Sequence, residues 1–483
     1  MFSRSAGAPL IEGNAVELLI DGRANFDAWL AAIRTAQRSV LFENYIFDEE
    51  LAREFRDALS ERASAGVHVS VVRDWLGSLG GSRDRFWAPL RAAGGEVRTY
   101  NPIRFTRPLG WLSRDHRKLL VVDSDVGFIS GVCVSKTWLG NPERGIAPWR
   151  DTGVAIRGPA VRDMAVAFAD NWARLGEGLP ASLSVLHEVP APAGDVALRV
   201  VATLPSTAGI YRLDHMIAAM AKTSVWLTDA YFVGTASYVQ ALSAAARDGV
   251  DVRLLIPGTS DIRTVGFLSR VGYRPLLEAG VRVFEWNGTM IHAKTAVTDG
   301  RWARVGSSNL NLASWMGNCE IDVAIEDELF ARRMEAQYEA DLGGATEILL
   351  HARRRPRADR ARAPRRPRPG SRAAGSSGRA AAGAMRLANS VGAAISNQRV
   401  LETSERGVLV GGAVVLLGIA VIAWFWPRAL AWPLGLIALW FAISLVSRYV
   451  ASGRRARPGG SAPAATSEDE PASATRSRAS PGP

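Results

Sequence analysis

The chain has 483 residues, enough for two or three domains, and a formal net charge of +11. The positive surplus lies in the last part, because residues 1–350 hold 37 basic and 41 acidic residues, whereas residues 351–483 hold 21 and 6. This distribution argues against a protein that binds nucleic acid over a basic folded surface. The two cysteines, Cys133 and Cys319, provide no disulfide framework and fit a reducing compartment.

Strand and helix patterns alternate through the first part of the chain. Helical spacing over 26–36 is followed by a buried strand at Ser39–Phe47. A helix is expected from about residue 50 to residue 65, ending at Gly66, and a strand at Val67–Val72. This alternation predicts an α/β layered sheet.

Two copies of the pattern His-x-Lys-x4-Asp occur, as His116, Lys118 and Asp123 and as His292, Lys294 and Asp299. Composition alone gives about 0.05 His-x-Lys pairs in a chain of this make-up. Of the 58 basic residues 54 are arginine, so a lysine marks a place that requires a compact ammonium group. An imidazole beside an ammonium suits phosphate chemistry, in which one group attacks phosphorus while positive charge neutralises the oxygens.

Strand geometry separates the members of each motif. The stretches Lys118–Val122 and 294–298 read as strands, so the histidine and lysine of each motif share a face. Asp123 lies seven residues beyond His116, on the opposite face and roughly 23 Å along an extended strand. Geometry therefore predicts a structural role for Asp123 and Asp299 at the next turn.

The same order of elements recurs later in the chain. The stretch 224–232 repeats Ser39–Phe47, and the second motif histidine follows the first at a similar offset. These echoes predict an internal duplication with half of the active site in each copy. The expected fold is α/β, with two α/β/α sandwich halves at 1–190 and 191–350 about a pseudo-two-fold axis that brings His116 and His292 together. The loop Tyr100–Trp111 is either an ordinary surface loop or a lip of the pocket that touches lipid.

The composition changes after residue 350. Residues 351–405 form an Arg-, Pro- and Ala-rich linker that we expect to be mostly disordered, with nine arginines between Arg353 and Arg368. Such a run could hold nucleic acid or anionic lipid. The final stretch, 451–483, is a low-complexity tail.

Two apolar segments, Val408–Trp426 and Ala429–Val446, are separated by Pro427 and Arg428. Each approaches the roughly 20 residues that a bilayer requires. We therefore predict a C-terminal transmembrane helical hairpin within 406–450. Arginines flank both outer ends, so the positive-inside rule places both ends on the cytoplasmic side.

With its two motifs, the chain resembles the phospholipase D superfamily, and over about 15–350 it resembles bacterial cardiolipin synthases. The stretches that carry the second resemblance are Phe42–Asp48, Arg114–Leu119, Trp149–Thr152, Ala230–Val233 and Gly306–Leu310, followed by Asn318 and Glu320. The resemblance implies a phosphatidyl transfer in two steps through a phosphohistidine, with no metal or other cofactor. One motif histidine, usually the first, attacks phosphorus, and the other serves as acid and then as base.

The resemblance also implies roles for particular residues. The six motif residues, including Asp123 and Asp299, form the catalytic set, although the strand geometry favours a structural role for these two aspartates. Asp151, 35 residues beyond His116, and Glu320, 28 residues beyond His292, would each orient the imidazole that precedes it. Phosphate contacts would come from Ser130, Gly131, Ser307 and Asn309. Cys133 stands where the second copy has Asn309, so the first half is expected to lack one phosphate contact.

The implied partners are phosphatidylglycerol, other phospholipids and the anionic inner leaflet, with no nucleic acid; the oligomeric state is left open. The implied location is the bacterial inner membrane, with the catalytic region on the cytoplasmic side. Hydrolysis of phospholipid by the same chemistry is one alternative, because the motifs do not distinguish water from an alcohol. A nucleic-acid phosphodiesterase and a catalytically inactive lipid-binding scaffold are two others.

Overall fold

The structure is a computed structural model of the chain. It describes residues 2–350 apart from 80–83, 104–111, 182, 184–187, 206, 263–265, 267–268 and 271, and scattered positions between 417 and 443. The predicted linker at 351–405, most of the predicted hairpin at 406–450 and the tail at 451–483 lie outside the described residues. No helix in the described part of the chain is long and apolar enough to cross a membrane.

The described strands form one mixed, 15-stranded sheet. Its first half runs in the order β4-β3-β2-β5-β6-β7-β1, and its second half in the order β8-β14-β13-β12-β9-β10-β11-β15. The first-half strands are β1 (Ile11–Ile20), β2 (Ser39–Asn44), β3 (His68–Asp74), β4 (Glu96–Tyr100), β5 (Lys118–Val122), β6 (Val126–Ser130) and β7 (Thr152–Arg157). The second-half strands are β8 (Val196–Thr203), β9 (Ser224–Thr228), β10 (Asp251–Pro257), β11 (Arg282–Trp286), β12 (Thr295–Thr298), β13 (Trp302–Gly306), β14 (Glu320–Glu326) and β15 (Ala345–Ile348).

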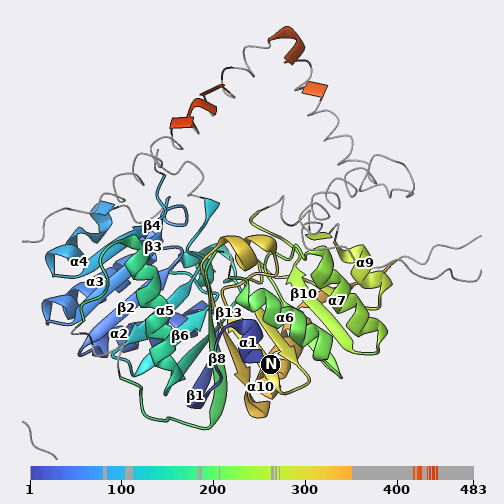
Figure 1. Cartoon of the computed structure of the whole chain (residues 1–483), viewed down its shortest axis with the longest axis horizontal. Helices are drawn as coiled ribbons and strands as arrows, with labels where there is room; N and C mark the ends of the chain where they lie inside the picture. The colour runs from blue at the N-terminus through green and yellow to red at the C-terminus, as the bar shows by residue number, and fades with distance from the viewer. Residues whose placement is uncertain are drawn as a thin grey trace, which may run out of the picture. The chain divides into compact units, whose positions relative to one another are not determined.

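The strand order reveals the duplication. Read outward from the centre, β1-β7-β6-β5-β2-β3-β4 matches β8-β14-β13-β12-β9-β10-β11, and β15 is an addition at one edge. The two copies meet where β1 pairs antiparallel with β8, with Ile11 opposite Leu198 and Asn14 opposite Val196. The two predicted halves therefore share one continuous sheet (Figure 1).

Helices cover both faces of each half of the sheet. The alternation of side chains along β2 sends Val40 and Phe42 into a core with α2 and α3, while Leu41 faces a second core with α5. The first-half helices are α1 (Phe2–Ala6), α2 (Asp21–Thr35), α3 (Glu49–Ser64), α4 (Ala88–Ala92) and α5 (Ala160–Leu175), with a short 3-10 helix at Asp84–Trp87. The second-half helices are α6 (Gly209–Met220), α7 (Ala236–Arg247), α9 (Tyr273–Glu278) and α10 (Glu328–Leu342).

The central core belongs to both halves. It includes Phe168 and Trp172 of α5, whose rings stack at 5.6 Å, and Trp226 and Tyr338 of the second half, whose rings stack at 5.4 Å. Two further cores lie under α2 and α3 in the first half and under α6 and α7 in the second, and the second of these also includes Ala6 and Ala8 at the start of the chain. Because the central core is shared, the two halves are held in one compact unit.

The predicted helix near residues 50–65 is present as α3. It begins after Asp48, whose side chain accepts a hydrogen bond from Glu50 N at 3.0 Å, and it ends before Gly66 at φ +90°. Gly249 occupies the same place after α7, at φ +93°. Glycine at both positions provides the left-handed conformation that ends a helix without strain.

Asp123 and Asp299 lie at the strand ends remote from the motif histidines, so their inclusion in the catalytic set is wrong. Asp123 follows β5, and its carboxylate accepts hydrogen bonds from the main-chain N–H groups of residues 37, 38 and 39 at 2.7–2.8 Å. Asp299 follows β12 and binds the N–H groups of residues 222, 223 and 224 at 2.8–3.1 Å. Each aspartate fixes the entry to β2 or β9, the structural role that strand geometry predicts. A surface cavity of about 430 Å³ beside Asp299 contains neither motif histidine.

Replacing Asp299 by alanine should lower the free energy of unfolding at neutral pH by about 2 kcal/mol, because several backbone donors lose an acceptor. Burial alone would raise the pKa of Asp299, but the hydrogen bonds from Ser224, Thr223 and Lys222 outweigh it and lower that pKa. The carboxylate therefore stabilises the fold above the usual aspartate pKa, and this contribution is lost as the pH falls through the lowered value. Denaturant unfolding should show the wild-type advantage at pH 7 shrinking below pH ~4. Equal stability of wild type and variant at pH 7 would contradict the assignment, and Asp299→Asn, which keeps one acceptor, should lose less.

Candidate active site

Two backbone bridges between the halves build the site. In one, His116 N donates to Cys319 O at 2.9 Å and Cys319 N donates to Arg114 O at 2.8 Å. In the other, His292 N donates to Arg150 O at 2.7 Å and Arg150 N donates to Met290 O at 2.9 Å. Each motif histidine is therefore paired with the residue immediately before a candidate carboxylate of the opposite half.

This pairing joins each imidazole to a carboxylate from the other half. His116 Nδ1 lies 2.9 Å from Glu320 Oε2, and His292 Nδ1 lies 2.8 Å from Asp151 Oδ2. Because Nδ1 lies against the carboxylate in both cases, Nε2 is the ring nitrogen on the far side from it, where Lys294 Nζ contacts that of His292 at 2.9 Å. The two carboxylates are the predicted ones, but the predicted partners are wrong, because each carboxylate orients the histidine of the other half and not the one that precedes it in the chain.

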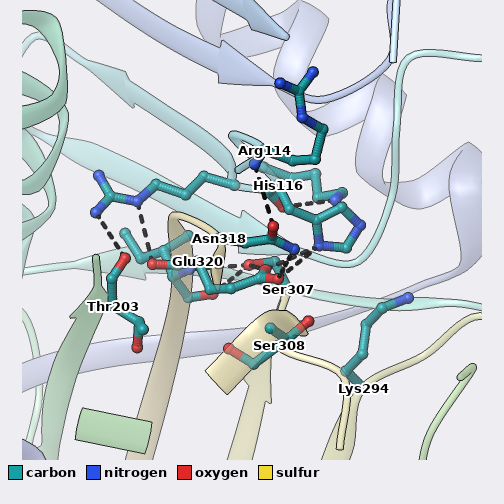
Figure 2. A network of polar contacts seen from close by, with 12 residues as sticks. Arg114, His116, Thr203, Lys294, Ser307, Ser308, Asn318 and Glu320 are labelled. Carbon is teal, nitrogen blue, oxygen red and sulfur yellow. Dashed lines mark hydrogen bonds and ion pairs between the residues drawn. The ribbon is translucent and has the colours of Figure 1, made fainter. Parts of the chain in front are cut away.

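Each carboxylate is held by a different neighbour. Ser307 Oγ donates to Glu320 Oε2 at 2.6 Å, which places Glu320 between Ser307 and His116 (Figure 2). The matching residue in the first half is Gly131, where a Cβ would lie 2.2 Å from Asp151 Oδ1. Trp138 Nε1 donates to Asp151 Oδ2 at 2.8 Å instead. Asp151 thus requires the glycine at position 131 beside it, whereas the longer side chain of Glu320 is held by the hydroxyl of Ser307.

The motif lysines are buried beside the histidines. Lys118 Nζ donates to His116 O at 2.6 Å, and Lys294 Nζ lies 2.9 Å from His292 Nε2. Burial and the Lys118 ammonium of the other half lower the pKa of Lys294 to about 8, against the opposing effect of Asp151. The two ammonium groups therefore repel one another within one site, which favours an anion between them.

Both imidazoles are held in the neutral form. Burial and the Lys294 ammonium lower the pKa of His292 to about 3, and burial lowers the pKa of His116 although Glu320 opposes the shift. Burial would raise the pKa of Asp151, but His292, Lys294 and Trp138 hold it at about 2. At neutral pH each imidazole can thus act as a base or nucleophile. A phosphate bound between the lysines would offset their charge and raise the imidazole pKa values, as an acid role requires.

Aromatic rings enclose one histidine more than the other. The ring centroids of Trp138, Trp149 and Tyr231 lie 5.1, 5.5 and 5.8 Å from that of His292. His116 has Tyr45 at 5.0 Å. The side chain of His292 is 5% exposed and that of His116 is 12% exposed. The two halves therefore present different surroundings to a substrate.

The four predicted phosphate-binding residues have different positions. Ser307 and Gly131 contact the orienting carboxylates, and Ser130 Oγ accepts a hydrogen bond from Val132 N at 3.1 Å. Asn309 is buried, and its Oδ1 has no hydrogen-bond partner among the described residues. Among these four residues, Asn309 is therefore the one with a buried side-chain atom, its amide oxygen, that has no partner among the described residues. Cys133, at the matching place in the first half, is buried as well.

Arg117 is a site residue that the sequence reasoning did not identify. Its buried guanidinium donates to Glu320 O at 3.1 Å, Ala167 O at 2.7 Å and Thr203 O at 3.3 Å, so it fixes the strand that carries Glu320. The second motif has Ala293 at this position. There Arg150 plays a corresponding part, since it binds both carboxylate oxygens of Asp341 at 2.8 and 2.9 Å. The difference between Arg117 in the first motif and Ala293 in the second is the sequence signal that could have identified this residue.

Within the described residues, no cluster of three or more His, Cys, Asp or Glu side chains could hold a metal ion.

Comparisons with known proteins agree with this geometry. Residues 215–342 match the family model described as "Cardiolipin synthase, PLD-like domain". The chain is 34% identical over 351 residues to cardiolipin synthase A of Pseudomonas fluorescens strain SBW25, covering 70% of this chain and 71% of that protein. It is 35% identical over 363 residues to cardiolipin synthase A of Pseudomonas aeruginosa strain LESB58, covering 73% and 71%. Phosphatidylserine synthase of Haemophilus influenzae Rd KW20 shares the fold, with a TM-score of 0.55 and 14% identity over 72% of this chain and 92% of that one.

The shared fold and the two matched motifs define a phospholipase D-like enzyme, a phospholipid phosphatidyltransferase. Within that superfamily, the chain belongs to the cardiolipin synthase family.

The exchange of carboxylates can be tested by substitution. Glu320→Gln keeps the shape but removes the charge that supports the His116 imidazolium, and we expect kcat/KM to fall by about 10- to 100-fold. In nitrogen-15 histidine spectra, Glu320→Gln should shift the His116 ring signals and leave those of His292 in place, while Asp151→Asn should do the reverse. Signals are assigned from the two His→Ala variants. Each carboxylate acting on the histidine of its own half would give the opposite pattern and refute the exchange.

Proposed function

We propose that the enzyme transfers the phosphatidyl group of one phosphatidylglycerol to the head-group hydroxyl of a second, forming cardiolipin and glycerol. The observation that carries this proposal is the pair of imidazoles, each held at Nδ1 by a carboxylate of the other half beside two buried ammonium groups. Two imidazoles at one phosphate allow one to bond phosphorus while the other moves the proton.

In the first step, His116 Nε2 attacks phosphorus, following the family resemblance. A nitrogen–phosphorus bond forms as the bond from phosphorus to the glycerol oxygen breaks. His292 supplies a proton to that oxygen, and glycerol leaves. Lys118, Lys294 and Asn309 would contact the phosphate oxygens, where negative charge is concentrated in the transition state.

In the second step, the now neutral His292 takes the proton from a head-group hydroxyl of the second phosphatidylglycerol. The hydroxyl oxygen attacks phosphorus, the nitrogen–phosphorus bond breaks, and His116 returns to its starting form. The carboxylates do not exchange protons in either step; Glu320 and Asp151 hold the ring orientation and support the charged imidazoles.

The surroundings of His292 favour an alcohol over water as acceptor. Trp138, Trp149 and Tyr231 cover the imidazole that must activate the acceptor, and enclosure of this kind limits the access of free water. A hydrolase of the phospholipase D type would use the same two histidines, and it remains the alternative function. The acidic balance of residues 1–350 disfavours a nucleic-acid phosphodiesterase, because such a site carries basic residues over its footprint.

Product analysis tests the function, and trapping tests the mechanism. Purified enzyme given phosphatidylglycerol should release glycerol and cardiolipin in equal amounts; phosphatidic acid as the main product would favour the hydrolase. His292→Ala, given a donor whose leaving group needs no protonation, should accumulate phosphatidyl label on His116, because no group remains to activate the acceptor. His116→Ala should accumulate none. Acid-labile label on His292 in the His116→Ala protein would reverse the two roles.

We further infer that the segments at 406–450 form a transmembrane hairpin that keeps the enzyme at the bacterial inner membrane, with the catalytic unit on the cytoplasmic side. Support comes from the two apolar runs, Val408–Trp426 and Ala429–Val446, and from the arginines outside both. The Arg-rich linker, 351–405, would add attraction to an anionic leaflet.

The topology gives a direct test. A reporter protein fused after Pro483 should give a cytoplasmic signal, because an even number of spans returns the chain to its starting side. The same reporter fused after Arg428, between the two segments, should give a periplasmic signal. A periplasmic signal at the C-terminal fusion would show that one segment does not cross.

A further inference from the structure

Several exposed, large apolar side chains of the catalytic unit lie on the edge of the sheet that carries the motif histidines. We propose that these side chains form a collar around the active site that enters the surface of the phospholipid bilayer. This inference rests on the proposed function, since it supplies the route by which a bilayer-resident lipid reaches the two histidines. The collar consists of Leu76, Leu79 and Leu112 in the first half and of Val233, Ile262, Leu312 and Met316 in the second.

The first part of the collar follows β3. Leu79 is 55% exposed, and Leu76 is exposed as well. Their loop is fixed against the site because Gly77 packs on the backbone of Tyr45, so closely that a Cβ there would lie 2.2 Å from Tyr45 O. The ring of Tyr45 in turn lies 5.0 Å from that of His116. The loop that carries Leu76 and Leu79 thus packs on Tyr45, whose ring lies beside His116.

The second part joins the two halves. Leu112 is 57% exposed and lies four residues before His116. The next residue, Ser113, donates through Oγ to Gly317 O at 2.6 Å, and Gly317 follows the exposed Met316. Apolar tips from loops about 200 residues apart in sequence therefore lie close together at the His116 side of the site.

The third part lies on the side of His292. Val233 N donates to Leu310 O at 3.2 Å, which places the exposed Val233 near Leu312, whose exposed fraction is 61%. Tyr231, next to His292, donates through its hydroxyl to Asp261 Oδ1 at 2.8 Å, and the exposed Ile262 follows Asp261. Both halves of the duplicated fold thus contribute apolar loop tips beside the motif histidine that they carry.

The distribution of these residues points to a bilayer rather than to a protein partner. They stand as single residues on separate loops, unlike the contiguous apolar patch of a protein interface. A bilayer accepts scattered apolar tips because its surface is fluid and deeper layers are hydrocarbon. These loops also flank the two histidines, which a lipid head group must reach while its acyl chains remain in the membrane.

Leu329 provides a matched control. It is a leucine with an exposed fraction of 63%, similar to that of Leu112. It lies in the first turn of α10, just beyond the end of β14 opposite to Glu320. Nine residues separate it from Glu320, roughly 20 Å or more along the strand.

The collar can be tested with fluorescent labels on the full-length protein. A single cysteine replaces Leu112, Leu312 or Leu329, is labelled with an environment-sensitive dye, and the protein is reconstituted in vesicles of phosphatidylglycerol and phosphatidylcholine. The native Cys133 and Cys319 are buried, and labelled wild type sets the background. A lipid with a shallow spin label should quench the dyes at 112 and 312 at least threefold more strongly than the dye at 329. Equal quenching at all three positions would overturn the collar. Protection of the dye at 112 from an aqueous quencher without quenching by the lipid would also overturn it.

Activity provides a second measurement. We expect the triple variant Leu79→Ser, Leu112→Ser, Leu312→Ser to lower the ratio of vesicle activity to detergent-micelle activity by about tenfold. The control triple Leu10→Ser, Val189→Ser, Leu329→Ser should leave this ratio unchanged, and a similar ratio for both triples would refute the collar. Failure of the proposed function looks different, because the labels at 112 and 312 would be quenched while no cardiolipin formed. Cardiolipin formation with an unquenched label at 112 would refute the collar alone.

Discussion

The active site depends on two backbone bridges that exchange a carboxylate between the halves. Because Cys319 pairs with Arg114 and His116, and Arg150 pairs with Met290 and His292, neither half contains a complete histidine–carboxylate pair. The bridges also allow charge to be buried. An isolated buried charge is costly, and these charges are tolerated at nearly zero exposure because the lysines donate to the main-chain oxygens of the histidines while the carboxylates accept hydrogen bonds from Ser307 or Trp138. Each histidine therefore gains its carboxylate only when the two halves dock, so docking and assembly of the active site occur together.

Where the duplicated halves differ, residues that contact one another differ together. Glu320 occurs with Ser307, whereas Asp151 occurs with Gly131, because the shorter carboxylate occupies the space that a serine side chain would need. The aromatic residues around the two histidines also differ. Among the described residues, three aromatic rings enclose His292 and one lies beside His116. A single site that must bind a donor lipid and then an acceptor benefits from such unequal sides.

Sequence reasoning reached the features that depend on local spacing. The period of a strand puts His116 and Lys118 on one face and separates Asp123 from them, and the structure has this arrangement. The cross-half pairs were out of reach, because the His292–Asp151 and His116–Glu320 contacts join residues 141 and 204 positions apart. The role of Arg117 and the pairing of β1 with β8 were missed for the same reason: one sequence gives no record of which distant segments meet.

The central position of β1 has a consequence for the order in which the chain folds during synthesis. Its partners are β7 in the first half and β8 in the second, so until β8 leaves the ribosome β1 is an open edge of the sheet. At that stage Asp151 also lacks His292, and His116 lacks Glu320. An incomplete polypeptide therefore exposes a strand edge that chaperones can bind, and its site lacks the residues that the second half supplies. Catalytic competence begins only when translation has passed Glu320.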